Sequence, residues 1–526
     1  MKYACKEITH ILLIAYQSYR TDSILRLTVW LLNIKNNKLI FPTILYVFYI
    51  IILAAGMYHH EMWRDELQAW SIARDSTNFL DLYKNLRYEG TPGLWHLCLF
   101  FLSRVTRNPV VMQIFHFLIA SVTTALILYK TKLPSILKAF YIVGYFSLFE
   151  YGVISRNYAL GLLFAVLVAI EMAKNSQNYI KMAVFAVFMG FTSIHGLLLS
   201  VCVIPYILID NTKTFKLQGF IDTLRKSLLP IAIIVLGIAL SYLSALPPKD
   251  GTPNELFRTY KDKKLFMETF SSMWYSYVPI PIERVNFWNS NLVTNLSTSF
   301  QLSVALLFIT ATLLIKRPKL LVFYLSSTFL ILFFSYTKFS GTLRHWGHLY
   351  VAFLMVLTAF YGKNETTNTR LNTAHKWVFT LFVSSVFITQ AFAGVKAMRL
   401  EIMYPFSAGK ETAKFISENY PERFIIADDQ VYVNDVGMYL DEPTYSTLLE
   451  EKSSFAVWKQ NIKYGREDTG RTIKKGLELR EKMPETKILL VTSYFIDEST
   501  WPVNLIHTSG PFITTKRPVN VYEIKN

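Results

Sequence analysis

Long runs of apolar residues separated by short basic connectors constrain this chain more than any other feature. The first run covers residues 41–58, and similar runs recur up to residues 377–394. A helix needs about 17–25 apolar residues to cross the roughly 30 Å of hydrocarbon in a bilayer. The chain is 52% hydrophobic and only 17% charged, whereas soluble proteins carry about 25% charged residues. The sequence therefore predicts an integral membrane protein with many spans.

The excess of basic residues indicates orientation rather than nucleic-acid binding. The formal net charge is +17, but Lys and Arg lie mainly in the connectors between apolar runs. Basic loops of this kind remain on the cytoplasmic side of a membrane, so we expect no nucleic-acid partner. Residues 1–40 have basic side chains and lack the apolar core and cleavage site of a signal peptide. We interpret them as a cytoplasmic or interfacial segment.

Alternation of apolar runs with basic connectors predicts a polytopic domain over residues 41–395 with about eleven spans. Its carboxyl end lies outside the cell membrane in this topology. The predicted spans are residues 41–58, 110–129, 134–152, 158–172, 182–194, 197–209, 228–246, 302–315, 320–336, 346–361 and 377–394.

Two long loops face outside in this topology. The first covers residues 59–109, and the second, residues 247–300, is rich in aromatics and is interpreted as accessory. Within the first loop, residues 94–107 are apolar but short for a full crossing. We interpret them as an interfacial helix, because a span there would place Lys130 outside.

From residue 396 to residue 526 the composition changes to that of a water-soluble domain. Two segments have helical patterns and three have the patterns of strands, and this order predicts a small extracytoplasmic α/β layer domain. The expected helices cover residues 410–420 and 472–482, and the expected strands cover residues 424–427, 488–491 and 519–524.

One polar stretch, residues 59–96, stands between apolar blocks and holds the main candidates for chemistry. It places Asp65 and Glu66 side by side just after the first span. A solvated loop also accounts for this pair taken alone. Carboxylates beside cations and aromatics suit a reaction that deprotonates a hydroxyl while an anionic leaving group departs. Further polar residues on the same predicted side are Arg64, Glu89, His96, Arg156, His195, Arg344 and His345.

Short motifs in this order resemble a known family. After the Asp65-Glu66 pair, residues 88–95 read Tyr-Glu-Gly-Thr-Pro-Gly-Leu-Trp, residues 155–160 read Ser-Arg-Asn-Tyr-Ala-Leu, and residues 192–197 read Thr-Ser-Ile-His-Gly-Leu. Together they resemble polyprenyl-phosphate-dependent glycosyltransferases of the GT-C fold, in the branch of protein O-mannosyltransferases and lipid A aminoarabinose transferases. The family's acidic-x-Pro-Pro-Leu-like segment keeps one proline here. The resemblance covers the chain best up to about residue 210.

The resemblance implies a fold and a set of roles. The fold would be an all-α membrane bundle of the GT-C type with the α/β domain outside. Asp65 would be the general base, and Glu66 would orient the acceptor or Asp65. Sugar would pass from a polyprenyl phosphate or diphosphate to an extracytoplasmic lipid, glycan or protein, with inversion. Arg156, Arg344 and His345 would bind the donor phosphate, and Arg64, Glu89, Tyr158 and His195 would contact the substrates.

Several alternatives stay open at this level. Arg156 also fits a cation at the end of a span. The aromatics of residues 274–288 fit either of two roles, stacking on sugar faces or lipid, or an interfacial belt. A polysaccharide or lipid-linked-oligosaccharide transporter would be expected to show repeat symmetry and broken spans in matching halves, which the sequence lacks. A glycan polymerase or ligase of another membrane fold would not centre on an acidic pair after the first span.

A metal site is also left open. Glu89 occupies the place where some relatives of the aminoarabinose branch use a glutamate as a zinc ligand. His96, His195 and His345 would be the side chains to complete such a site, so a divalent metal cofactor is one alternative. A thiolate site is not expected, because the three cysteines are far apart: Cys5, Cys98 and Cys202.

Overall fold

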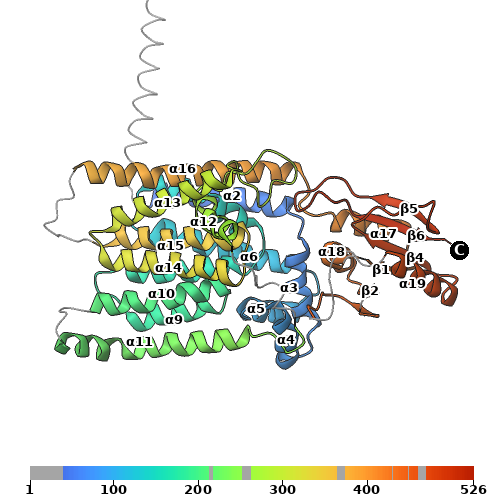
Figure 1. The fold of residues 1–526 in the computed structure, drawn as a ribbon, viewed down its shortest axis with the longest axis horizontal. Helices are drawn as coiled ribbons and strands as arrows, with labels where there is room; N and C mark the ends of the chain where they lie inside the picture. Colours follow the sequence, from blue (N-terminus) through green and yellow to red (C-terminus); the bar gives the residue numbers. More distant parts are fainter. Residues whose placement is uncertain are drawn as a thin grey trace, which may run out of the picture.

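The computed structural model describes residues 39–211, 217–251, 262–363, 373–428, 430–447, 449–459 and 469–525. These residues form a bundle of helices and, at one end of it, a smaller α/β unit that ends the chain (Figure 1). The predicted helical membrane bundle with a carboxyl-terminal sheet region is therefore confirmed. The segment predicted over residues 1–40 lies almost wholly outside the described residues.

Seven helical segments of the described chain are long and apolar enough to cross a membrane. Outer helices expose apolar side chains, such as Ile44, Val47 and Ile51 on the first of them, as a surface in contact with lipid requires. The segments belong to α2 (Ile40–His59), α6 (Val110–Lys130), α7 (Ser135–Ile142) continued by η2 (Tyr145–Val153), α11 (Leu217–Ser244), α13 (Leu296–Leu314), α14 (Pro318–Thr337) and α16 (Thr373–Met403).

The predicted count of eleven spans stays a prediction. Shorter apolar helices complete the bundle, and α15 (Leu343–Gly362) is buried along most of its length. A helix that is apolar on all sides belongs inside a bundle, which explains why α15 is surrounded by other helices. The shorter apolar helices are α5 (Leu94–Ser103), α8 (Tyr158–Met172), α9 (Tyr179–Gly190) and α10 (Ile194–Asn211).

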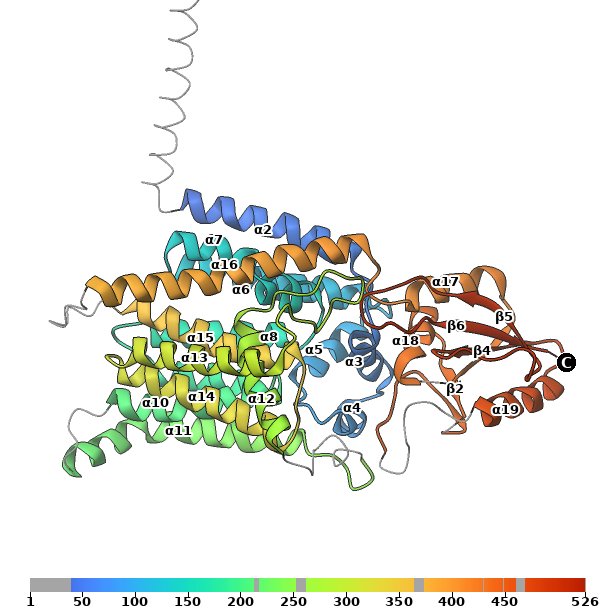
Figure 2. The same ribbon diagram turned by 45° about the horizontal axis from the view of Figure 1, so that its top comes forward.

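The first predicted outer loop folds into short helices between the bundle and the α/β unit (Figure 2). They are α3 (Arg64–Asp75), α4 (Phe79–Leu86), the single 3-10 turn η1 (Arg87–Glu89) and α5. With ten residues, α5 is about 15 Å long, which is half the thickness of the hydrocarbon layer. Its length agrees with the interfacial interpretation of residues 94–107.

The second predicted outer loop, residues 247–300, is not wholly a loop. Its described part contains α12 (Lys263–Tyr277), which packs against α13 and α15. This helix buries serines instead of an apolar run; for example, the hydroxyls of Ser271 and Ser299 are hydrogen-bonded at 3.1 Å. Hydropathy alone gave no sign of the helix for that reason.

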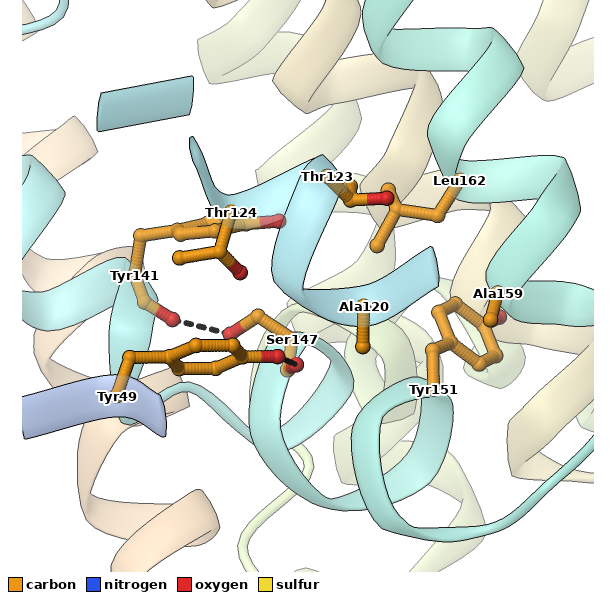
Figure 3. Close-up of a pocket in the computed structure, with 9 residues that line it drawn as sticks. All are labelled: Tyr49, Ala120, Thr123, Thr124, Tyr141, Ser147, Tyr151, Ala159 and Leu162. Carbon is orange, nitrogen blue, oxygen red and sulfur yellow. Dashed lines mark hydrogen bonds between the residues drawn. The ribbon is translucent and has the colours of Figure 1, made fainter. Parts of the chain in front are cut away.

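A π-helix lies at the centre of the bundle. All nine residues of η2 are buried, and π-helices are rare features that often accompany functional sites. Hydroxyl groups satisfy its irregular backbone: Tyr49 donates to the Ser147 carbonyl at 3.0 Å, and the Ser147 hydroxyl donates to the Tyr141 carbonyl (Figure 3). The chain leaves η2 directly towards Ser155 and Arg156, so this packing sets where those two residues lie.

The carboxyl-terminal unit is a six-stranded mixed sheet with strand order β3-β2-β1-β4-β6-β5. The central strands β1 and β4 are parallel and read as continuous apolar runs, because helices cover both faces. Accordingly, Ile425 packs with residues of α17 and α18, and Ile426 packs with α19. The elements are α17 (Gly409–Asn419), β1 (Arg423–Ala427), α18 (Gln430–Leu440), β2 (Thr444–Ser446), β3 (Glu451–Ser453), α19 (Thr469–Lys482), β4 (Lys487–Thr492), β5 (Val503–Thr508) and β6 (Asn520–Ile524).

Candidate active site

A cavity of about 480 Å³ lies among helix ends on the side of the bundle next to α3 and α5. Its lining comes from α3, η1 and α5 of the first predicted outer loop and from the ends of α8, α10, α11, α14 and α15. Seven residues singled out from the sequence line it: Asp65, Glu89, His96, Arg156, Tyr158, His195 and His345. The apolar lining includes Ile194, Leu197, Leu198, Leu246, Phe334 and Phe339.

Three guanidinium groups surround the carboxylate of Asp65. Its Oδ1 lies 2.7 Å from Arg64 Nη2, and its Oδ2 lies 3.0 Å from both Arg156 Nη1 and Arg344 Nη2. Arg64 belongs to α3, Arg156 to the connector before α8, and Arg344 to the first turn of α15. The side chain of Asp65 keeps 16% exposure, and that exposed part belongs to the cavity lining.

The arginines keep Asp65 ionised. Burial alone would raise the pKa of this carboxyl, but Arg64, Arg344 and Arg156 outweigh that effect and hold the pKa well below its usual range. Asp65 is also in the first turn of α3, where the helix dipole favours a negative charge. At neutral pH the side chain is therefore a hydrogen-bond acceptor with no proton of its own.

Arg344 contacts Asp65 from behind the cavity wall. Its guanidinium carbon lies 5.2 Å from the ring centre of Trp63 and 5.3 Å from that of Trp288, and the two indoles form an edge-to-face pair. The backbone carbonyl of Arg344 accepts a hydrogen bond from the Tyr151 hydroxyl at 2.7 Å. The predicted phosphate ligand Arg344 and the predicted substrate ligand Arg64 thus contact Asp65 and are not part of the cavity lining.

Glu66, predicted to orient the acceptor or Asp65, points away from the cavity. Its Oε1 accepts the Ser155 N–H at 2.6 Å, and its Oε2 accepts the Trp63 N–H at 3.1 Å and lies 2.9 Å from His60 Nε2. The other ring nitrogen of His60 lies 2.8 Å from Glu401 Oε1 on α16. Glu66 therefore connects the backbone of Trp63, just before α3, with the backbone of Ser155, next to Arg156.

His60 forms the centre of a buried bridge between two carboxylates. Burial opposes protonation of this imidazole, but Glu66 and Glu401 outweigh that effect and raise its pKa to about 10. Both ring nitrogens then act as donors, one to each glutamate. Because the three side chains are fully buried, the bridge holds the end of α2, the start of α3 and the end of α16 in one arrangement.

His345 reaches the cavity with a defined tautomer. Its Nδ1 accepts the Thr342 N–H at 3.0 Å in the N-terminal cap of α15. A neutral imidazole with Nδ1 as acceptor carries its proton on Nε2, so Nε2 is the donor. The ring of His195 lies 5.3 Å from that of His345, and within the described chain its buried Nε2 has no hydrogen-bond partner.

Glu89 lines the cavity with one carboxyl oxygen already bonded. Its Oε1 accepts from Gln68 Nε2 at 2.9 Å and from the indole N–H of Trp458 at 3.3 Å. Burial raises the pKa of this carboxyl. In the described part of the chain no three His, Cys, Asp or Glu side chains gather as metal ligands. The residues present therefore do not fit the metal alternative.

Several residues of the site were not identified from the sequence. Gln68 and Trp458 contact the cavity residue Glu89, Lys338 lines the cavity, and Glu401 pairs with His60 beside it. They come from separate segments with no shared motif, so no local signal marks them. Glu401 in particular falls in the predicted water-soluble domain, whereas in the structure α16 continues to Met403 and carries Glu401 in its last turn.

Comparison with known proteins found no matching family model and no matching curated protein. Among solved structures, the chain is similar to ArnT from Cupriavidus metallidurans bound to undecaprenyl phosphate, with 10% identity and a TM-score of 0.45. It is also similar to the same protein in the apo state, with 11% identity and a TM-score of 0.47. Each comparison covers 91% of this chain and 97% of the other.

Proposed function

We propose that this protein is an integral membrane glycosyltransferase that moves a sugar from a polyprenyl-phosphate carrier to a hydroxyl group on the extracytoplasmic side. The observation that carries the proposal is the position of Asp65. Its carboxylate, ion-paired to three arginines, lines a cavity that also has apolar side chains from helices of the membrane bundle, such as Leu197, Leu198 and Phe334. A polyprenyl-phosphate sugar has the same division between a charged, hydroxylated head and an apolar tail.

The charge of the site matches the charge that the reaction produces. Three guanidinium groups and one carboxylate leave the ion-paired cluster with a net charge of +2. A polyprenyl-phosphate sugar carries one negative charge, and the polyprenyl phosphate released from it approaches two. The attraction therefore grows as the glycosidic bond breaks, and an interaction that strengthens in the transition state accelerates the reaction.

Helix orientation adds to this attraction. The first turns of α8, α10 and α15 all contribute to the cavity lining, through Tyr158, Ile194 and His345. Helix N-termini carry a partial positive charge that favours anions. Arg156, His345 and Lys338, which follows α14, are among the cationic or donor side chains of the lining, and we assign the donor phosphate to them.

In the proposed step, the acceptor hydroxyl oxygen attacks the anomeric carbon of the donor sugar. The bond from that carbon to the phosphate oxygen breaks, the electron pair leaves with polyprenyl phosphate, and the hydroxyl proton passes to Asp65. A carboxylate with a low pKa is a weak base as long as all of its arginines are bonded to it alone. Donor phosphate bound at Arg156 competes with Asp65 for that guanidinium, so donor binding makes Asp65 more basic.

Replacing Asp65 by Asn in purified protein reconstituted in lipid nanodiscs tests this assignment. Undecaprenyl-phosphate sugars are supplied as donors, and undecaprenyl phosphate released in the presence of native membranes is measured by mass spectrometry, a readout that does not depend on the sugar. Loss of a general base is worth about 10²–10⁴ in rate, so we expect a decrease of at least a hundredfold. Asp81→Asn, a partly exposed position in the same loop that is not part of the cavity lining, serves as the matched control. A folded Asp65→Asn protein with the wild-type rate would exclude Asp65 as the base.

A further inference from the structure

One short segment of the carboxyl-terminal unit reaches the wall of the cavity. This segment, residues 453–459, follows β3 and lies along α3 and η1; we call it the strap. Gln68 on α3 makes both hydrogen bonds of an amide pair with it: Gln68 Nε2 donates to the Ala456 carbonyl at 2.7 Å, and the Ala456 N–H donates to Gln68 Oε1 at 2.9 Å. The side chain of Gln68 thus bonds to the strap much as a neighbouring strand would.

The same glutamine continues the contact to the cavity. Its Nε2 also donates to Glu89 Oε1, and that oxygen receives a second hydrogen bond from Trp458 of the strap. Two N–H donors on Oε1 leave Oε2 as the oxygen available to a ligand in the cavity. The strap therefore determines both the position and the orientation of the Glu89 carboxyl group.

Charged, polar and apolar contacts hold the carboxyl-terminal unit, and the strap with it, against α3 and α5. Arg74 on α3 lies 2.6 Å from Asp441 beyond α18, and Ser454 donates to Asp75 at 2.6 Å. The Tyr439 hydroxyl donates to the Met62 carbonyl at 2.8 Å. An apolar cluster also runs across the contact, because Met438 packs among residues of α3 and α5. The α/β unit is thus held on the outer-loop helices by several independent interactions.

Glu89 and Asp65 line the cavity from the first predicted outer loop, whereas apolar lining residues such as Leu197, Leu198 and Phe334 come from bundle helices. A lipid tail belongs beside these apolar side chains, which leaves the acceptor beside Asp65 and Glu89. We propose that Trp458 is a positioning residue for the acceptor, acting through Glu89, so that Glu89 Oε2 engages a second hydroxyl of a polyhydroxylated acceptor. The inference rests on the proposed transferase function and assigns to the carboxyl-terminal unit a part in acceptor recognition.

Trp458→Phe tests the inference, because it removes the indole N–H and keeps an aromatic ring. Native membranes of the producing cells, titrated by dilution, supply the acceptor, and an undecaprenyl-phosphate sugar supplies the donor. A lost hydrogen bond to a charged or strongly polar group is worth roughly 1.5–3 kcal/mol, so we expect the apparent KM for acceptor to rise about tenfold or more. The KM for donor is expected to stay within about twofold, and Trp458→His, which retains a ring N–H, is expected to restore part of the effect.

Trp501→Phe in the same unit is the matched control and is expected to leave both KM values unchanged. Hydrogen exchange at the Ala456 amide gives a readout without turnover: Gln68→Ala should accelerate it, since Gln68 Oε1 is the acceptor of that N–H. The inference would be wrong, and the proposed function would stand, if wild type and Trp458→Phe had equal KM values for acceptor. The same holds if the Ala456 amide exchanged equally fast in wild type and Gln68→Ala. Wild-type protein that releases no undecaprenyl phosphate would instead overturn the proposed function, and the inference with it.

Discussion

The imidazole of His60 and the carboxylate of Glu401 meet at 2.8 Å although 341 residues separate them in the sequence. His60 follows the last residue of α2, and Glu401 lies in the last turn of α16. Through Glu66 the same imidazole is connected to the backbone at Ser155. The bridge therefore holds the start of α3, which carries Asp65, next to the connector that carries Arg156. None of its three side chains is part of the cavity lining.

We expect His60→Gln to lower the free energy of unfolding. We also expect the stability of this variant to lose the dependence on pH above neutrality that His60 causes in the wild type. Because the pKa of His60 is raised to about 10 in the folded state, its contribution is complete below pH 6.5 and is lost as the pH rises through about 10. The shift in pKa corresponds to a contribution on the order of 5 kcal/mol to the free energy of unfolding. Melting temperature in detergent from pH 6 to 10.5 measures it.

The neighbouring His59→Gln is the control for that experiment, because His59 is exposed. We expect the melting temperature of wild type and His59→Gln to decrease between pH 8 and 10.5, and that of His60→Gln to change little. A parallel decrease in all three proteins would show that His60 is not the group responsible.

Arg156→Lys is expected to weaken donor binding. Arg156 lines the cavity and pairs with Asp65, and lysine keeps the charge but loses the planar fork that suits a phosphate. We expect the KM for an undecaprenyl-phosphate sugar to rise about tenfold or more, and undecaprenyl phosphate to give a smaller thermal shift. Arg284→Lys, at an exposed site, serves as the control. Unchanged donor KM would remove Arg156 from the phosphate site.

Arg344→Lys is expected to act on turnover rather than on donor binding. Arg344 lies behind Asp65, between Trp63 and Trp288, and an ammonium group does not stack there as a guanidinium does. We expect kcat to fall about tenfold while the KM for donor changes by less than about threefold. Steady-state kinetics measured beside Arg156→Lys separate the two arginines, and a donor KM that rises as in Arg156→Lys would place Arg344 on the phosphate.

Gly394→Ala is expected to destabilise the bundle. At this point α16 crosses the start of η2 so closely that a Cβ atom would lie 2.1 Å from the Val143 carbonyl oxygen and 2.6 Å from the carbonyl carbon of Gly144. Overpacking against backbone costs about 1–3 kcal/mol or more, so we expect a lower melting temperature and less folded protein. Gly510→Ala, where a Cβ meets nothing within 4 Å, should match wild type.

Sequence patterns accounted for the elements whose burial is regular. The spans with uniform apolar runs, such as α2 and α6, and the doubly covered strands β1 and β4 agree with their predicted residues within a few positions. The helix α12 was missed, because its buried residues include three serines, whose hydroxyls donate to carbonyls of the same helix. For the site, the order of motifs singled out Asp65, Glu89 and the later Arg and His residues, and seven of the residues singled out line one cavity.

The sequence by itself determined that the chain is a membrane bundle with a polar loop after its first span, because hydropathy and charge distribution act residue by residue. Only the tertiary structure decided which side chain of the adjacent acidic pair faces the cavity. Asp65 and Glu66 are neighbours on α3, and a helix turns about 100° per residue. Asp65 therefore meets Arg156 at the cavity, while Glu66 points into the interior and pairs with His60.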